Sequence, residues 1–230
     1  MKLEVIYEDN HLIAVNKKSS DIVQGDKTGD KPLSDYVKDY IKEKYNKPGE
    51  VYLGVAHRID RPTSGVVVFA RTSKALTRLN KMFQEKKVQK TYWAVTKKAP
   101  PKTTETLTHW LKRNTKQNKS YANPKPVNEG KESSLTYTLV GKGDNFHYLE
   151  IKPHTGRHHQ IRTQLCFIGC PIKGDLKYGA KRSNKNASIH LHAREIEFIH
   201  PVKKEPIIIT ANPDINDSIW KDFLKLNTKK

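Results

Sequence analysis

Short apolar runs separated by turn-forming residues make up most of the chain. Residues 3–7 and 12–16 are two β-prone runs with Glu8-Asp9-Asn10 between them, which predicts a hairpin. Residues 66–70 (VVVFA) are continuously β-branched or aromatic, a pattern typical of a buried strand. Further strands are predicted at residues 90–96, 134–140, 146–152, 189–201 and 206–211.

Helical spacing of apolar residues occurs between these runs. It predicts a helix from residue 32 with Asp30 as its N-cap, another within residues 72–87 with Ser73 as its N-cap, and others from about His158 to Ile168 and at 217–226. Strands outnumber helices and are often consecutive. We therefore predict an α+β fold with a mixed, largely antiparallel β-sheet flanked by helices and loops.

The chain shows no internal repeat and no linker strong enough to divide it, so we expect one domain over residues 1–230. Residues 97–133 are poor in aliphatic side chains and rich in Lys, Pro, Asn and Thr. This composition predicts a basic insertion that stays mobile until a partner binds.

The net charge indicates the kind of partner. Lysine and arginine number 43 against 24 acidic residues, a formal charge of +19. Such a surplus concentrates a polyanion at the surface and makes binding salt-dependent through counterion release. Charge favours a nucleic acid, but it also fits a ribosome-associated structural protein or a protein of the membrane surface.

Several function classes lack their sequence signals. There is no glycine-rich dinucleotide motif and no P-loop, so no nucleotide cofactor is expected. The acids are scattered, which disfavours a metal-dependent nuclease, and His190 and His192 are interpreted as hydrogen-bonding or RNA-contacting residues rather than zinc ligands. No secretory leader or spanning apolar run is present, and two cysteines make no disulfide framework. We expect a cytoplasmic, monomeric protein without a metal or a membrane partner.

The stretch AHRIDRPTSG, residues 56–65, places Asp60 between Arg58 and Arg61 in a predicted loop. Cations on both sides favour the ionised carboxylate, which suits a nucleophile or an electrostatic stabiliser better than a general acid. A surface ion pair is the alternative, since such pairs are common and weak. The residues alone leave both interpretations open.

A second stretch, KPHTGRHHQIRTQL, covers residues 152–165. Thr155 and Gly156 predict a turn before a helix, and His158 and Arg162 lie four apart, on one predicted helix face. A guanidinium on a rigid element can grip a carboxylate or a phosphate at two points. An amphipathic helix with a basic face is the alternative.

Together, HRIDRPTSG and TGRHHQIRTQL resemble the RluA-type family of RNA pseudouridine synthases. Supporting stretches follow in the family's order: YEDNHLIAVNK, KTYWAV, CPIKGDLKYG and IHLHAREIEFIHP. The resemblance covers roughly residues 4–211. One departure is Lys18-Ser19-Ser20, where the family usually has a proline, small residues and a glycine, and it leaves the local loop path open. The chain is also expected to lack the small N-terminal RNA-binding module of many members.

The resemblance implies the pseudouridine synthase catalytic fold and the isomerisation of uridine in rRNA or tRNA without a cofactor. Asp60 would be the catalytic aspartate, attacking either the sugar or the base. Arg58 would help extrude the uridine, Tyr92 would place its ring against the flipped base, and Arg162 would pair with Asp60. Supporting residues of unresolved role are His57, Arg61, Arg157 and His159. The competing hypothesis is a non-catalytic RNA-binding or ribosome-assembly protein on the same fold.

Overall fold

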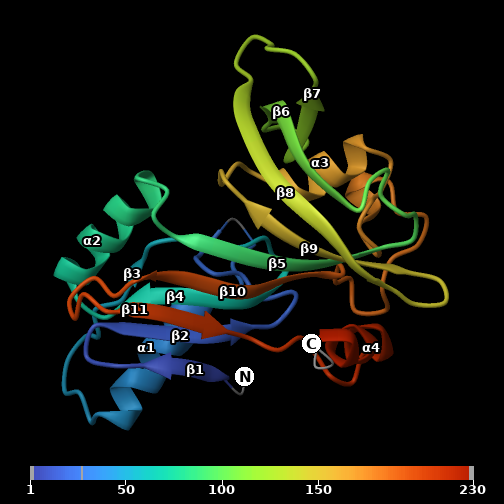
Figure 1. Cartoon of the computed structure of the whole chain (residues 1–230). Helices are drawn as coiled ribbons and strands as arrows, with labels where there is room; N and C mark the ends of the chain where they lie inside the picture. The colour runs from blue at the N-terminus through green and yellow to red at the C-terminus, as the bar shows by residue number, and fades with distance from the viewer. Residues whose placement is uncertain (1–2, 27, 228–230) are drawn as a thin grey trace. The chain divides into compact units, whose positions relative to one another are not determined.

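The computed structural model describes residues 3–26 and 28–227, and these form two compact units (Figure 1). The first unit holds the chain up to Gln89 together with Ala193–Asn212, and the second holds Lys90–His192 and the segment that starts at Pro213. That the two units act as a single catalytic domain stays a prediction.

In the first unit the strands follow the order β1-β2-β4-β10, with β3 beside β4 and β11 beside β10. The pairs β1–β2, β2–β4, β3–β4 and β10–β11 are antiparallel, as predicted. The elements are β1 (Val5–Glu8), β2 (Leu12–Lys17), α1 (Leu33–Lys44), β3 (Gly54–Val55), β4 (Ser64–Ala70), α2 (Ser73–Gln84), β10 (Leu191–Ile199) and β11 (Pro206–Thr210).

Both faces of this sheet are covered, which explains the unbroken apolar run of β4. Successive residues of β4 point to opposite faces. Val66 and Val68 pack in a cluster with Leu79 of α2, whereas Val67 and Phe69 pack in another with the apolar face of α1. The two helices therefore lie on opposite sides of the strands (Figure 1).

In the second unit the strands follow the order β5-β9-β8-β6-β7, and each neighbouring pair is antiparallel. Helix α3 packs on one face of these strands through Ile161 and Leu165, and helix α4 on the other through Trp220 and Phe223. The elements are β5 (Gln89–Thr96), β6 (Thr104–Asn114), β7 (Lys119–Asn123), β8 (Lys131–Lys142), β9 (His147–Pro153), α3 (Gln160–Phe167), the 3₁₀ helix η1 (Leu176–Tyr178) and α4 (Ser218–Asn227).

The basic segment 97–133 contains strands that its composition did not predict. It holds β6, β7 and the start of β8, and Thr106 and Thr136 pair across β6 and β8 with their hydroxyl oxygens 2.8 Å apart. Threonine is a good strand former although it is not aliphatic. The expected mobility of the segment stays a prediction. Within the part of the chain that the structure describes, no helix is both long and apolar enough to cross a bilayer.

Candidate active site

The Asp60 motif is a loop that closes the β3–β4 hairpin of the first unit. Residues 56–63 lie outside regular structure, and the Thr63 backbone N–H donates to the Asp60 carbonyl across 3.0 Å, which closes a tight turn over Arg61-Pro62. Thr63 is buried and Asp60 is half-buried. The turn thus fixes the backbone that directly follows the Asp60 side chain.

A buried lysine donates a hydrogen bond to the backbone of this turn. Lys17, the last residue of β2, is fully buried, and its ammonium donates to the carbonyls of Lys18 (2.9 Å), Asp21 (2.8 Å) and Arg61 (3.1 Å). Burial lowers the pKa of Lys17 to about 7, against the opposing effect of the Asp21 and Asp60 charges. Because an ammonium has three N–H donors, all of them are used.

Ser20 marks the departure from the family's usual sequence in this loop. Its backbone N–H donates to the Arg61 carbonyl across 2.9 Å, so two donors converge on the residue after Asp60. Ser20 has a φ of 77°, a left-handed conformation that glycine adopts at lower cost. The sequence departure therefore leaves strain at one residue while the loop still reaches the Asp60 turn.

The end of the motif requires glycine. Gly65 opens the paired part of β4 opposite Lys17, with a φ of 116°. A Cβ there would lie 2.2 Å from the carbonyl oxygen of Ala193 in β10. Only a residue without a side chain allows the two backbones to approach so closely.

Arg61, which follows Asp60 in the motif, has a second acidic residue as a partner. The Arg61 guanidinium donates to Asp30 across 2.7 Å, in an ion pair whose side chains are 44% and 51% exposed. Asp30 therefore does not cap α1; Pro32 occupies the N-cap position without a side-chain cap. That Arg61 stabilises the Asp60 carboxylate stays a prediction, and what the structure shows is that the backbone carbonyl of Arg61 accepts two hydrogen bonds at the turn.

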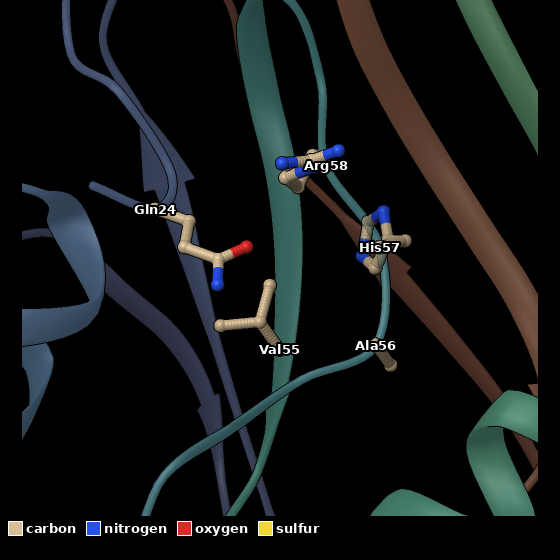
Figure 2. A pocket seen from close by; sticks show the side chains of 5 residues that line it. All are labelled: Gln24, Val55, Ala56, His57 and Arg58. Atoms are coloured by element: carbon tan, nitrogen blue, oxygen red, sulfur yellow. The ribbon is translucent and has the colours of Figure 1, made fainter. Parts of the chain in front are cut away.

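Arg58 and His57 border an open pocket of about 290 Å³ in the first unit. Figure 2 shows the side chains around it, with Arg58 at its edge and Gln24 across from it. Arg58 is exposed. His57 is held, because its Nε2 accepts the Val68 backbone N–H across 3.0 Å and its ring lies 5.1 Å from that of Phe83. His57 is thus a support of the loop, and Arg58 is the exposed cation.

Arg162 lies in the second unit, on the buried side of α3. It is 4% exposed, and it pairs in a two-point grip with Asp175: Nε to Oδ2 is 2.7 Å and Nη2 to Oδ1 is 2.9 Å. Its Cζ lies 5.0 Å from the ring centre of Tyr178. These contacts fix the plane and direction of the guanidinium. The pairing of Arg162 with Asp60, which belongs to the other unit, stays a prediction.

Helix α3 begins two residues later than predicted. His159 has a left-handed backbone with a φ of 52° and is the N-cap, so the helix starts at Gln160. The prediction that His158 and Arg162 share a helix face is therefore wrong. The His158 Nδ1 instead lies 2.9 Å from the Ser120 hydroxyl of β7, and its ring stacks on that of His159 at 3.8 Å.

His159 contacts Tyr178, whose ring lies against Arg162. Its Nδ1 lies 2.9 Å from the Tyr178 hydroxyl, and burial, assisted by the nearby positive charge of Arg162, lowers its pKa to about 2. The neutral imidazole is therefore a hydrogen-bonding partner of Tyr178 across the physiological range. Arg157, by contrast, is exposed; its backbone N–H donates to the Gln160 side chain across 3.0 Å, and its Nε donates to the Glu132 carbonyl across 3.5 Å.

Tyr92 lies on the same face of the second unit's sheet as α3. It pairs with Ile151 of β9 and packs against the cluster that contains Ile161 and Leu165. The structure thus brings two of the predicted catalytic residues, Tyr92 and Arg162, to one side of one sheet. Asp60 lies in the other unit, and its placement beside them stays a prediction.

Sequence reasoning missed the supporting residues Lys17, Asp175 and Tyr178. Two of them lie in CPIKGDLKYG, which was recognised only as a family stretch. The sequence offered one signal, the single acidic residue Asp175 in this stretch, because a buried carboxylate needs a cation as its partner. Periodicity could not indicate which arginine it meets.

His190 forms hydrogen bonds, as predicted. Its Nδ1 lies 3.0 Å from the Asn184 amide, and its Nε2 lies 3.1 Å from the carboxylate of Asp217. Asp217 also accepts the backbone N–H of Ile219 across 2.9 Å at the start of α4. Among the described residues, no group of three or more His, Cys, Asp or Glu side chains is placed to hold a metal ion.

Comparison with known proteins identifies relatives along most of the chain. Residues 11–166 match the family model described as RNA pseudouridylate synthase. The ribosomal large subunit pseudouridine synthase C of Buchnera aphidicola subsp. Baizongia pistaciae is 33% identical over 96% of this chain and 69% of its own length. The tRNA pseudouridine synthase C of Vibrio cholerae serotype O1 is 29% identical over 96% of this chain and 94% of its own length.

Solved structures show the same fold. Human RNA Pseudouridylate Synthase Domain Containing 4 superimposes with a TM-score of 0.79 over 92% of this chain and 89% of the human chain, at 22% identity. Human RNA Pseudouridylate Synthase Domain Containing 1 gives a TM-score of 0.70 over 93% of this chain and 84% of its own, also at 22% identity. The predicted fold class is confirmed.

Proposed function

Because the chain belongs to the RluA-type family of RNA pseudouridine synthases, we propose that it converts particular uridines of ribosomal or transfer RNA to pseudouridine with Asp60 as the nucleophile. The observation that carries the proposal is the way Asp60 is presented. Its carboxylate lies on a turn whose backbone a buried lysine and a backbone amide hold at the next residue. A fixed backbone with a half-buried side chain suits a group that must meet a substrate carbon in one orientation.

The reaction is an isomerisation and balances without a redox partner. An Asp60 carboxylate oxygen bonds to a carbon of the sugar or of the base, and the glycosidic C–N bond breaks. The detached base turns, and its C5 joins the sugar carbon. The proton on C5 is lost, N1 gains a proton, and the Asp60 ester is released. The choice between sugar and base attack stays open.

The other predicted residues receive roles from their positions. Arg58 is exposed at the edge of the pocket, where it can contact the backbone of an extruded nucleotide. Tyr92 offers its ring to the flipped base. Asp175 accepts hydrogen bonds from Nε and Nη2 of Arg162, and Arg162 is proposed to pair with Asp60. His57 and His159 support these groups, and Arg61 and Arg157 face the RNA.

The test is product formation by the wild type and by Asp60→Asn, which keeps the shape and removes the charge. Unmodified ribosomal and transfer RNA transcripts are incubated with each protein in a chelator, and pseudouridine is measured by mass spectrometry of nucleosides. Wild type should form product, and the variant at least about 10⁴-fold less, because loss of a nucleophile removes the reaction path. Asp39→Asn, an exposed carboxylate of α1, should match the wild type.

If Asp60→Asn still binds RNA, its loss of product formation comes from the chemical step and not from RNA binding. Equal product from Asp60→Asn and the wild type would overturn the assigned nucleophile. No product from the wild type on either RNA class, with RNA still bound, would favour the non-catalytic RNA-binding alternative. A chelator-sensitive strand break would instead favour a nuclease.

A further inference from the structure

Lys90 is a cation without a partner beside the candidate site. It lies on β5, half-buried, and its ammonium forms no hydrogen bond or ion pair with any residue of the described chain. Alternation along a strand places its side chain on the same face as that of Tyr92, two residues on. Burial alone lowers the pKa of Lys90. An ammonium in this position is unfavourable for folding unless an anion joins it.

Gly156 lies close to this ammonium. A Cβ added at Gly156 would lie 3.6 Å from the Lys90 Nζ. Gly156 is exposed and belongs to the TGRHHQIR stretch that leads into α3. Its φ is outside the left-handed region, so backbone strain does not require a glycine here. A side chain at position 156 would stand in contact with the ammonium, and glycine leaves that contact out.

We propose that the Lys90 ammonium binds a phosphate of the RNA backbone adjacent to the target uridine. The inference rests on the proposed function, because it places the flipped nucleotide against Tyr92. A phosphate supplies the missing counter-charge, and a compact ammonium suits a single anionic oxygen. Lys90 is thus a positioning residue for the substrate, and neighbouring Tyr92 contacts the base.

The first test is the salt dependence of RNA binding by Lys90→Met. Loss of one phosphate contact should reduce the slope of log K against log salt by about 0.7 to 0.9. Affinity at low salt should fall roughly 10- to 100-fold, the size of a hydrogen bond to a charged group. Lys221→Met, which removes a charge from exposed α4 of the same unit, is the matched control for net charge.

Kinetics and stability separate this role from a structural one. A contact made equally in the bound and transition states raises KM and leaves kcat nearly unchanged. Lys90→Arg should recover most of the affinity, and Gly156→Ala should weaken binding only when Lys90 is present. Lys90→Met should unfold at the same temperature as the wild type or above it, since it removes a half-buried cation without a partner.

A synthetic RNA with a neutral methylphosphonate beside the target uridine identifies the phosphate. The substitution should weaken binding to the wild type and have little further effect on Lys90→Met. An unchanged salt slope in Lys90→Met, a loss no larger than that of Lys221→Met, or a lower unfolding temperature would each overturn the inference. The binding slope does not depend on turnover, so this result is independent of whether the wild type forms pseudouridine.

Discussion

In residues 56–63 of the first unit, hydrogen bonds fix the backbone, and the arginine side chains are exposed. Around Arg162 of the second unit, hydrogen bonds fix the side chains instead. Two donors, from Lys17 and Ser20, converge on the Arg61 carbonyl, while Arg58 and the Arg61 guanidinium are exposed. Arg162, in contrast, is gripped at two points by buried Asp175.

Under the proposed function, this difference corresponds to two tasks of a catalytic site. A group that must bond to substrate needs an accessible side chain on a fixed backbone, and a group that orients it needs a fixed side chain. Substitutions should therefore have different consequences in the two regions. Changes at Asp60 should remove activity and leave stability nearly unchanged, and changes around Arg162 should affect stability first.

The largest stability effect is expected for Arg162→Met. It leaves the Asp175 carboxylate, which is 1% exposed, buried without its guanidinium, at a cost of about 3 to 5 kcal/mol in the free energy of unfolding. Urea denaturation measures this. Arg162→Met with Asp175→Leu should recover much of the loss, because the orphaned charge is gone. A loss below about 1 kcal/mol in the single variant would contradict the interpretation of a buried, mutually dependent pair.

Lys17→Met tests the backbone support of the Asp60 turn. It removes the donor that three carbonyls share, and we expect a loss of about 2 to 3 kcal/mol in the free energy of unfolding. Because the released Arg61 carbonyl follows Asp60 directly, kcat should also fall about 100-fold. Stopped-flow or discontinuous pseudouridine assays measure kcat. A stable variant with normal kcat would show that the turn does not depend on this lysine.

The pH dependence of stability should reveal His159. Its folded pKa is lowered to about 2, whereas the unfolded chain protonates it near pH 6.5. Below that pH the unfolded chain binds more protons than the folded protein, so stability falls as the pH decreases, by at most about 1.4 kcal/mol per pH unit. Above pH 6.5 this contribution is constant.

His159→Asn should reduce the slope between pH 6.5 and 5 and leave the contributions of His109, His190 and His200, whose pKa values burial also lowers. Asparagine has no proton to gain and tolerates the left-handed backbone. Unfolding in urea at several pH values gives the comparison. His154→Asn, at an exposed histidine of the same unit, should keep the wild-type slope. Equal slopes for His159→Asn and the wild type would contradict the assignment.

The fold was predictable where local pattern and burial agree. The run at 66–70 is a strand covered on both faces because α1 and α2 each supply an apolar side, and the alternation at 134–140 and 146–152 gave a true hairpin. The strands within 97–133 were not predicted, because β6 has the polar His109 between Leu107 and Leu111 on its buried face and β7 buries Ser120, so neither strand shows an apolar alternation.

The sequence predicted the candidate catalytic residues, but it did not predict the residues that fix them in place. The motifs named Asp60, Tyr92 and Arg162 through a family resemblance. The partners of Arg162 come from a segment that starts 13 residues after it, where chain folding decides the contact. The late start of α3 depends on one left-handed residue, His159, which helical spacing treats as any other position.

The smallest effect on stability and activity is expected for Arg61→Met. This substitution tests the side chain of Arg61 separately from its backbone carbonyl. The carbonyl of Arg61 holds the Asp60 turn, but its guanidinium pairs with Asp30 in an exposed ion pair, which contributes at most about 0.5 kcal/mol. Arg61→Met keeps the carbonyl, so stability and kcat should stay at wild-type values. RNA affinity at low salt should fall only two- to threefold, because one exposed cation is lost.

Asp30→Asn is the matched control, since it frees the guanidinium without removing it and should leave RNA affinity unchanged or slightly higher. Binding titrations at two salt concentrations and steady-state assays measure these outcomes. A large loss of kcat in Arg61→Met, with none in Asp30→Asn, would mean that the guanidinium leaves Asp30 to act on the Asp60 carboxylate during the reaction. Fixing the backbone would then be insufficient to orient the proposed nucleophile. The first unit would also depend on a fixed side chain, and the contrast between the two regions would be wrong for the first unit.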